Sequence, residues 1–480
     1  MPANPMIRTQ GFIDGAWVDA KATFAVTNPA TGAEIARVAD MGATEARQAI
    51  MAAKTAFLAW AKLLARDRAA ILRRWHALIM ENIDALAELL TLEQGKPLAE
   101  ARGEIAYGAG FIAFFAEEAT RIYGDIIPSF RPDARILVLK QPIGVVAAVT
   151  PWNFPNAMIT RKIAPALAAG CTVVCKPAED TPLSALALAA LAEQAGFPRG
   201  VLNIVTTSNP APVGTELATH PDVRALAFTG STAVGRLLMQ QAAGTIKKVA
   251  LELGGNAPFI VFDDADIDAA VAGAMIAKFR NAGQTCVCAN RIFVQERVYD
   301  AFAEKLAVAA RKLKTGNGME TGVEQGPLIN AQALAKVEAH IKDATAKGAR
   351  IITGGKPHAQ GGTFFEPTIL TGVTKDMLVM HEETFGPVAP LIKFRGEDEV
   401  IAMANSTEFG LAGYFYARDM ARVWRVAEAL EVGIVGVNTG LISDATVPFG
   451  GVKQSGLGRE GSRYGIDDYV ELKYVMLAGL

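Results

Sequence analysis

The segment from Asn281 to Cys288 contains the residues best suited to covalent chemistry in this chain. It is short and polar, it includes a glycine, and it carries two thiols, Cys286 and Cys288. A thiolate acts as a nucleophile when a substrate can reach it and its surroundings activate it. A lone cysteine is more often a small buried side chain, and Cys175, which follows two valines, fits that role. The polar neighbours of Cys286 indicate a nucleophile at that position.

A carboxylate, Glu252, lies at the end of an apolar run that we expect to form a strand. Burial raises the pKa of a carboxyl group. A raised pKa suits a general base that works near neutral pH. The alternative is a structural role, in which Glu252 pairs with a basic neighbour.

Two other segments have residue types that can hold a nucleotide. Phe228-Thr229-Gly230-Ser231 follows an apolar run and precedes a helix, so its small residues let backbone N–H groups approach a phosphate. Lys176 and Glu179 follow another apolar run, where their side chains suit ribose hydroxyls. Without further context, an ordinary turn and a solvated loop pair are the simpler interpretations. A glycine-rich match at residues 108–113 lies within helical sequence, so it lacks the strand-to-helix geometry of a dinucleotide fingerprint.

Alternating strands and helices must position these residues. From Gly144 onward, short continuous apolar runs alternate with helical sequence, and a similar alternation begins after Leu251. This order is typical of βαβ units with helices on both faces of a parallel sheet, so the predicted fold class is α/β. Residues 44–121 have helical spacing with a break at Gly95-Lys96-Pro97. The expected strands are 135–140, 145–149, 171–175, 201–205, 259–262 and 291–294, and the expected later helices are 157–169, 183–195, 266–279 and 299–312.

The composition excludes several classes of protein. A chain of 480 residues that is 51% hydrophobic and 20% charged can bury a large core in about two to three domains, which excludes general disorder. The 47 basic and 49 acidic residues nearly cancel, so we expect no nucleic-acid or membrane-surface partner. Residues 1–17 lack the apolar run of a secretory signal, and no segment is typical of a transmembrane helix. The four cysteines and five histidines lack zinc-site spacing, so we expect a reduced, cytoplasmic protein without a metal site.

Six motifs, in order along the chain, resemble those of the aldehyde dehydrogenase superfamily. They are Pro151-Trp152-Asn153-Phe154-Pro155, Phe228-Thr229-Gly230-Ser231, Leu251-Glu252-Leu253-Gly254-Gly255, Gly283-Gln284-Thr285-Cys286, Glu382-Glu383-Thr384-Phe385-Gly386-Pro387 and Pro448-Phe449-Gly450-Gly451. The resemblance implies a Rossmann-like NAD(P)-binding domain (1–120 and 143–253), an α/β catalytic domain (254–454) and a small β oligomerisation element (121–142 and 455–480). Subunits of this family pair through the last element, so we expect a homo-oligomer, either a dimer or a tetramer.

The resemblance also implies catalytic roles. The Cys286 thiolate attacks an aldehyde to give a thiohemiacetal, whose oxyanion is stabilised by the Asn153 amide and the backbone N–H of Cys286. Hydride transfer to NAD(P) leaves a thioester, and Glu252 activates the water that hydrolyses it. Lys162 and Glu460 match a proton path to that glutamate. The residues that match the cofactor site are Trp152, Lys176, Glu179, Gly230, Ser231, Glu383 and Phe385.

Within the superfamily, the chain most closely resembles the succinate-semialdehyde dehydrogenases. The matching segments are Thr160-Arg161-Lys162, Phe279-Arg280-Asn281 and Cys286-Val287-Cys288. The resemblance implies that Arg161, Arg280 and Ser443 hold the distal carboxylate of the substrate in an otherwise apolar tunnel. Surface ion pairing is the alternative role of the two arginines. Glutarate semialdehyde and a broader range of aliphatic aldehydes are alternative substrates, since one methylene changes binding by only about 1–3 kcal/mol.

Cofactor choice depends mainly on Glu179. Its carboxylate should repel a 2′-phosphate and favour NAD, although Lys176 can offset that repulsion, which leaves NADP open.

Cys288 raises a redox hypothesis, because a disulfide to Cys286 would remove the nucleophile. Some succinate-semialdehyde dehydrogenases are switched in this way. The bond requires Cα atoms within about 7 Å. Loss of activity in peroxide that a thiol reverses would test this hypothesis.

Two functions from other classes remain as alternatives. A cysteine hydrolase or acyltransferase needs a base such as histidine beside Cys286, and none of the five histidines is close to it in sequence. A non-enzymatic role on a retired scaffold has no support, because every residue that the chemistry requires is present.

Overall fold

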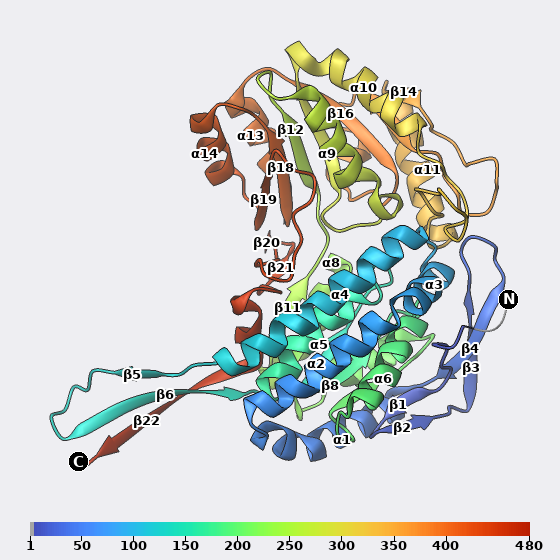
Figure 1. Ribbon diagram of the computed structural model, residues 1–480. Coiled ribbons are helices and arrows are strands. Elements are labelled where there is room, and N and C mark those ends of the chain that lie inside the picture. Colours follow the sequence, from blue (N-terminus) through green and yellow to red (C-terminus); the bar gives the residue numbers. More distant parts are fainter. Residues whose placement is uncertain (1–3) are drawn as a thin grey trace.

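Two β-sheets with helices on both faces form the body of the chain, and a long arm projects from it (Figure 1). The computed structural model describes residues 4–480. Residues 1–3, at the start of the segment considered as a secretory signal, lie outside the described residues. The α/β fold class predicted from the alternating apolar runs is confirmed.

The first sheet has eight strands in the order β2-β1-β9-β8-β7-β10-β11-β21. Its centre is parallel and consists of β7 (Val145–Val149), β8 (Thr172–Lys176), β9 (Leu202–Ile204), β10 (Val223–Thr229) and β11 (Lys248–Glu252). Antiparallel edges are added by β1 (Gly11–Ile13), β2 (Ala16–Val18) and β21 (Gly456–Leu457). Every residue of β7 and β8 is buried, as expected for strands that helices cover on both faces.

Helices enclose the first sheet from two sides. One face is covered by α2 (Ala65–Glu81), α3 (Ile83–Gln94), α4 (Leu98–Glu118), α5 (Ala157–Ala169) and α6 (Leu183–Ala195). The other face is covered by α1 (Ala43–Lys62), α7 (Pro210–Thr219) and α8 (Thr232–Ala242). All thirteen residues of α5 are buried, so this helix is a fixed support at the centre of the molecule.

The second sheet has seven strands in the order β14-β15-β16-β13-β12-β18-β19. Only β14 (Arg350–Thr353) is antiparallel; the others are β12 (Ala257–Val261), β13 (Ala289–Gln295), β15 (Thr368–Thr371), β16 (Val388–Phe394), β18 (Ala412–Tyr416) and β19 (Ile434–Val437). One face is covered by α9 (Ile267–Phe279) and α10 (Tyr299–Arg311). The other is covered by α11 (Ala331–Ala346), α13 (Glu397–Asn405) and α14 (Met420–Ala429).

The arm is a three-stranded antiparallel sheet in the order β22-β6-β5 (Figure 1). It consists of β5 (Asp125–Ile127), β6 (Ala134–Pro142) and β22 (Val470–Ala478). Residues 456–457 pair instead with β11, and the short helix Arg463–Tyr469 packs against α5. The projecting strand therefore begins at Val470.

The expected elements correspond closely to the observed ones after residue 140. Helices α5 and α6 have the predicted bounds, and the strands differ by one or two residues. In the region 44–121, the predicted break at Gly95-Lys96-Pro97 is confirmed. Two further breaks, at Leu63-Leu64 and at Asn82, were not predicted because neither contains glycine or proline.

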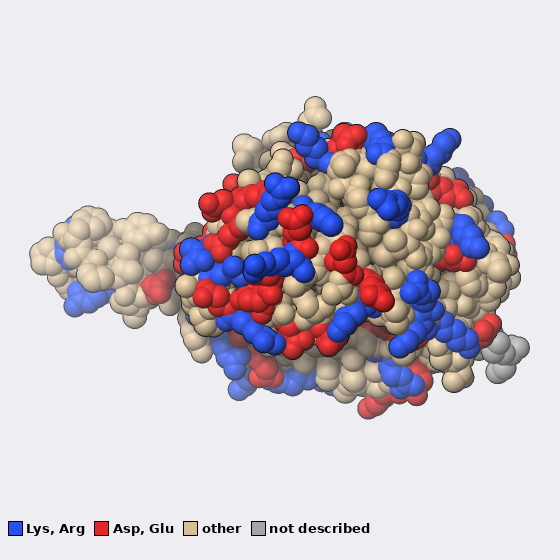
Figure 2. Space-filling view, turned by 90° about the horizontal axis from the view of Figure 1, so that it is seen from above, with Lys and Arg blue, Asp and Glu red and all other residues tan. Residues whose placement is uncertain are grey.

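The surface carries no large area of one charge on the face seen in Figure 2, where basic and acidic side chains are interspersed. The arm, at the left of that view, shows mainly uncharged side chains. Within residues 4–480, no helix combines the length and apolarity needed to cross a membrane.

Candidate active site

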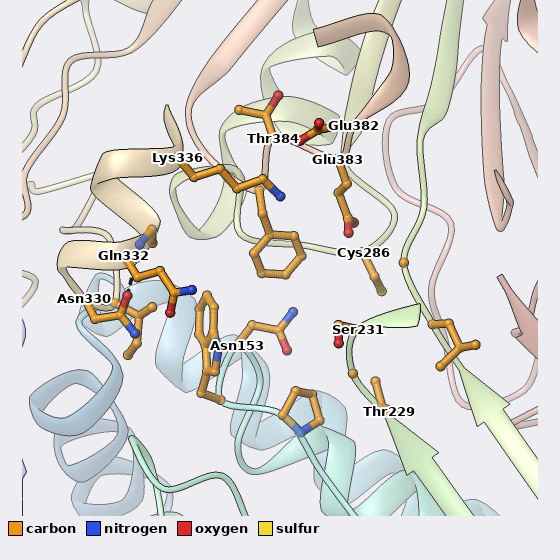
Figure 3. Close-up of a pocket in the computed structure, with 18 of the residues that line it drawn as sticks. Asn153, Thr229, Ser231, Cys286, Asn330, Gln332, Lys336, Glu382, Glu383 and Thr384 are labelled. Atoms are coloured by element: carbon orange, nitrogen blue, oxygen red, sulfur yellow. Dashed lines mark hydrogen bonds between the residues drawn. The ribbon is translucent and has the colours of Figure 1, made fainter. Parts of the chain in front are cut away.

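The site lies where the carboxyl edge of the first sheet meets the amino edge of the second. Asn153, Ser231 and Leu253 follow strands β7, β10 and β11, whereas Cys286 and Glu383 precede β13 and β16. Residues from both groups line one cavity, and Figure 3 shows Asn153, Ser231, Cys286 and Glu383 converging on it. Side chains at the carboxyl ends of parallel strands commonly form ligand sites.

The loop before Cys286 has an unusual backbone. Asn281, Ala282 and Gly283 have φ values of 53°, 55° and 74°, a left-handed conformation that non-glycine residues rarely adopt. Hydrogen bonds from a neighbouring segment hold it: the Asn281 N–H donates to Glu100 at 2.9 Å, and Gln94 donates to the Asn281 side chain at 3.0 Å. The loop presents a half-buried Cys286 thiol to the cavity.

The Asn153 amide is held beside this loop. Its Nδ2 donates to the carbonyl of Gln284 at 3.1 Å, which leaves the second N–H of that nitrogen for another acceptor. The carbonyl of Asn153 accepts a hydrogen bond from Asn281 at 2.9 Å. The amide is therefore oriented in advance of any ligand.

Glu252 is a buried carboxyl group without a hydrogen-bond partner. It is the last residue of β11 and is 4% exposed, and among the described residues neither oxygen accepts a hydrogen bond. Burial, reinforced by repulsion from Glu460, raises its pKa well above the ordinary value. The sequence-based expectation of a carboxyl group with a raised pKa agrees with this environment.

A buried cluster of charges lies beside Glu252. Lys162 donates to Glu460 Oε1 at 2.5 Å, and Arg161 Nη2 lies 2.8 Å from Glu460 Oε2. Burial alone would raise the pKa of Glu460, but the two cations outweigh it and hold that pKa below its ordinary value. The two glutamates therefore favour opposite protonation states, with Glu460 charged and Glu252 neutral.

Cys286 lines two cavities. The larger, of about 800 Å³, also contains Trp152, Gly230, Ser231, Glu383 and Phe385 from the expected cofactor residues (Figure 3). Ser231 is the N-cap of α8, so the helix N-terminus points backbone N–H groups toward this cavity. Burial raises the pKa of Glu383 to about 7.

The smaller cavity, of about 290 Å³, contains the expected substrate residues Arg161, Arg280 and Ser443. Arg161 is 2% exposed and lies 4.0 Å above the ring of Phe449, so surface ion pairing is excluded for it. Within the described chain, its Nε and Nη2 atoms have no hydrogen-bond partner of good geometry. Most of the surface of this cavity is apolar, as expected, although two carboxylates, Glu100 and Glu104, are also among its lining residues.

Comparison with known proteins agrees with this geometry, because the sequence profile of the aldehyde dehydrogenase family matches residues 17–475. The chain belongs to the aldehyde dehydrogenase family. It is 65% identical to a glutarate-semialdehyde dehydrogenase of Pseudomonas aeruginosa, with 99% of each chain covered. It is 63% identical to an NADP-dependent succinate-semialdehyde dehydrogenase of Escherichia coli, with 98% of each chain covered. A crystal structure of succinate-semialdehyde dehydrogenase from Burkholderia pseudomallei matches with a TM-score of 0.98 and 62% identity, covering 100% and 99% of the two chains.

Some residues of this aldehyde dehydrogenase lie outside the two cavities or were not expected. Lys176 and Glu179 do not line the larger cavity; they follow β8, the neighbour of β7, and are joined by a contact of 3.2 Å. Asn330, Gln332 and Lys336, at the start of α11, do line it (Figure 3). A single sequence gives no signal for these three, because they form no motif and lie far along the chain from the others.

The thiols differ in their surroundings. Cys288 is buried and donates to the carbonyl of Lys278 at 3.2 Å, and all four cysteines are free thiols. Burial raises the pKa of Cys286 to about 12, although Arg161 acts in the opposite direction. Burial thus favours the neutral thiol, which must lose its proton when it attacks. In the part of the chain that the structure describes, no group of three or more His, Cys, Asp or Glu side chains is arranged to hold a metal ion.

Replacing Gly283 with alanine should impair the enzyme strongly. A Cβ at this position would lie 2.2 Å from the carbonyl oxygen of Gly386, and φ there is +74°. The loop must shift, and a displacement of about 1 Å can reduce the rate about a hundredfold. The initial rate of reduced nicotinamide formation measures the effect.

Gly322→Ala is the matched control, because Gly322 has φ +78° with no atom within 4 Å of the added Cβ. It carries the same backbone strain, of about 1–2 kcal/mol, without the clash. Comparable activity of the two variants would contradict the fixed position of the loop.

Proposed function

We propose that this aldehyde dehydrogenase oxidises succinic semialdehyde to succinate with NAD(P). The observation that carries the proposal is the Arg161 guanidinium, which is buried and lines the same 290 Å³ cavity as Cys286. Its Nη2 lies 2.8 Å from Glu460, a carboxylate shared with Lys162, and its Nε has no acceptor within the described chain. A buried cation with free donors favours an anionic ligand, and a guanidinium matches the planar carboxylate. Two relatives bear the names of enzymes for semialdehydes that carry such a carboxylate.

The chemistry begins at Cys286. Its Sγ adds to the aldehyde carbon, the carbonyl π electrons move to the oxygen to give the oxyanion, and the thiol proton passes to solvent water as the carbon–sulfur bond forms. The second N–H of Asn153 Nδ2 and the backbone N–H of Cys286 stabilise the oxyanion, and loss of one such donor raises the barrier by about 3 kcal/mol. When bound, NAD(P) supplies the acceptor for the hydride that leaves this carbon.

Glu252 then acts on the thioester that remains. Because burial favours its neutral form, Glu252 must first release its own proton. Its carboxylate then accepts a proton from water, whose oxygen attacks the thioester carbon and displaces the Cys286 sulfur. Lys162 and Glu460 form the path by which that proton leaves, because they lie beside Glu252 and are joined at 2.5 Å. The products are a carboxylate and the restored thiol.

The larger cavity fits the proposed cofactor. It combines the N-terminus of α8, which suits a pyrophosphate, with Glu383, whose carboxylate suits ribose hydroxyls. At Gly230 an added Cβ would lie 2.4 Å from the ring of Phe228, so a larger residue there would require that ring to move. Trp152 and Phe385, which meet edge to face at 5.5 Å, would flank the nicotinamide end.

Glutaric semialdehyde is the alternative substrate within the same chemistry, and a broad aliphatic aldehyde specificity is the weaker one. One methylene is worth only about 1–3 kcal/mol, and the relative with 65% identity is a glutarate-semialdehyde dehydrogenase. A cysteine hydrolase is less well supported, because neither cavity that contains Cys286 has a histidine among its described lining residues.

We further propose that the arm joins copies of this chain into a dimer or tetramer. Several of its large apolar side chains are exposed, Ile126 and Phe130 by nearly four fifths and Leu472 by two thirds. Exposed apolar area of this kind is typical of an interface. The particle mass in solution tests this.

A cytoplasmic location is supported by the four free thiols, which suit a reducing compartment.

The first expected result is a preference for a substrate with a distal carboxylate. We expect kcat/KM for succinic semialdehyde to exceed that for butanal at least about a hundredfold, since the carboxylate pairs with a buried guanidinium. Arg161→Met should remove most of this preference and change the butanal rate little. Comparable values for the two aldehydes in the unmodified enzyme would discard the carboxylate site while leaving the dehydrogenase chemistry intact. Arg463→Met, at an exposed position, is the matched control.

Removing the base should separate the two half-reactions. In Glu252→Gln, hydride transfer needs no carboxylate at this position, but water activation does. We expect one reduced nicotinamide per active subunit in a rapid burst, followed by turnover at least about a hundredfold slower than normal. Stopped-flow absorbance measures the burst, and intact mass shows the acyl group on Cys286. Steady turnover near the normal rate would rule out this role of Glu252.

Cofactor preference should follow the charge at position 179. The side chain of Glu179 is 43% exposed and lies 3.2 Å from Lys176, so its repulsion of a 2′-phosphate is only partly offset. We expect NAD to be preferred, and Glu179→Ser to raise the NADP/NAD ratio of kcat/KM about tenfold. An unchanged ratio would show that cofactor choice is made elsewhere.

A further inference from the structure

A buried ion pair outside the catalytic set lies beneath the Asn153 loop. Lys96, from the Gly95-Lys96-Pro97 break, and Glu104, on α4, meet at 2.5 Å, and each side chain is 1% exposed. Burying two charges removes them from water, so such pairs are weak evidence for stability on their own. Their contacts therefore need another explanation.

Both side chains of the pair contact the loop between β7 and α5, Lys96 near its middle and Glu104 at its end. Lys96 Nζ donates to the carbonyl of Asn153 at 2.8 Å, and it lies 3.8 Å from the centre of the Phe154 ring. The other oxygen of Glu104 accepts hydrogen bonds from the backbone N–H groups of Asn156 and Ala157, at 2.9 and 3.2 Å. The two side chains thus fix the second half of the loop, from Asn153 to the beginning of α5.

The loop carries groups that the proposed reaction uses. Asn153 supplies the oxyanion donor, and its carbonyl also accepts from Asn281 of the catalytic loop at 2.9 Å. Two donors from different segments on one carbonyl restrict rotation of that peptide, and with it the direction of the side chain. The Phe154 ring lies between the loop and the substrate cavity, 5.6 Å from the Arg280 guanidinium.

We infer that the Lys96–Glu104 ion pair positions the Asn153 amide for catalysis. Lys96 acts through Asn153 and touches no reacting atom. The inference rests on the proposed role of Asn153 as the oxyanion donor. It predicts that loss of the pair slows hydride transfer, because the amide is less well aimed, while cofactor binding is retained.

The test is a double-mutant cycle on the full-length enzyme. The single variants are Lys96→Met and Asn153→Ala, and the third is their combination. The readouts are the single-turnover rate of hydride transfer at saturating succinic semialdehyde, the Kd of NAD, and the thermal unfolding midpoint. We expect Lys96→Met to slow hydride transfer about 10- to 100-fold in the normal background. In the Asn153→Ala background, the same change should slow it less than about threefold, since the group that Lys96 positions is gone.

Two more variants separate positioning from folding. Lys96→Met/Glu104→Gln removes the charge that Lys96→Met leaves unpaired, so it carries the test if the single variant does not fold. Arg68→Met is the matched control, because Arg68 is also a buried cation that donates to a carbonyl, that of Ala168 at the other end of α5, at 3.1 Å. It should lower the unfolding midpoint and leave hydride transfer unchanged.

The outcomes are distinct. If Lys96→Met leaves hydride transfer within threefold of normal, or slows it equally in both backgrounds, the positioning role is overturned. If Arg68→Met slows the reaction as much as Lys96→Met does, the effect is general destabilisation and the inference also fails. If Asn153→Ala itself has no effect on the rate, the proposed oxyanion donor is wrong, and the failure lies there.

Discussion

The hydrogen bond from the Asn153 amide to the carbonyl of Gln284 joins the two halves of the active site. Asn153 follows β7 of the first sheet, and Gln284 belongs to the loop before β13 of the second. Gln284 in turn accepts from the N–H of Ile329, at the edge of the larger cavity, and donates to the carbonyl of Asn281. The proposed oxyanion donor, the proposed nucleophile and the larger cavity are therefore held in one arrangement only while the two sheets keep their relative position.

The site also depends on how its buried charges are paired. Arg161 and Lys162 share Glu460, and Lys96 is matched by Glu104, so most of the charge is compensated. Glu252 is different, because both of its oxygens lack a partner within residues 4–480. In a low-dielectric setting an uncompensated carboxyl group stays neutral until a proton can be passed on, and the pairing around it thus selects which glutamate can serve as the base.

Local chemistry explains what could be predicted from sequence. The bounds of α5 and α6 follow from their apolar, alanine-rich spacing and from the glycine after each, which adopts the left-handed conformation. The polar thiol segment and the carboxylate at a strand end were visible because such residues are unusual there. Cys286 and the Gly230-Ser231 turn line the larger cavity, and Glu252 directly precedes its lining residues Leu253 and Gly254.

What the sequence could not provide were contacts between distant residues. In the sequence, Lys96 is an ordinary lysine within a helix break. Only the fold brings its ammonium group to the carbonyl of Asn153, 57 positions later. Lys336 belongs to an ordinary amphipathic helix, and nothing in its local pattern places it beside Glu383 in the cavity. The left-handed backbone at Asn281 and Ala282 is likewise imposed by partners, Glu100 and Gln94, from another part of the chain.

The two sides of the substrate cavity differ in rigidity, and this difference bears on chain length. Arg161 is anchored on a helix whose every residue is buried, so its guanidinium has a fixed distance to the thiol. Ser443 and Leu441 lie instead on an irregular loop between β19 and the next short strand. A substrate longer by one methylene requires part of the cavity wall to shift. An irregular loop such as the one that carries Ser443 shifts more easily than a fully buried helix such as α5. If the proposed function holds, we expect the residues around Ser443 to decide between four- and five-carbon semialdehydes and Arg161 to set the requirement for a carboxylate.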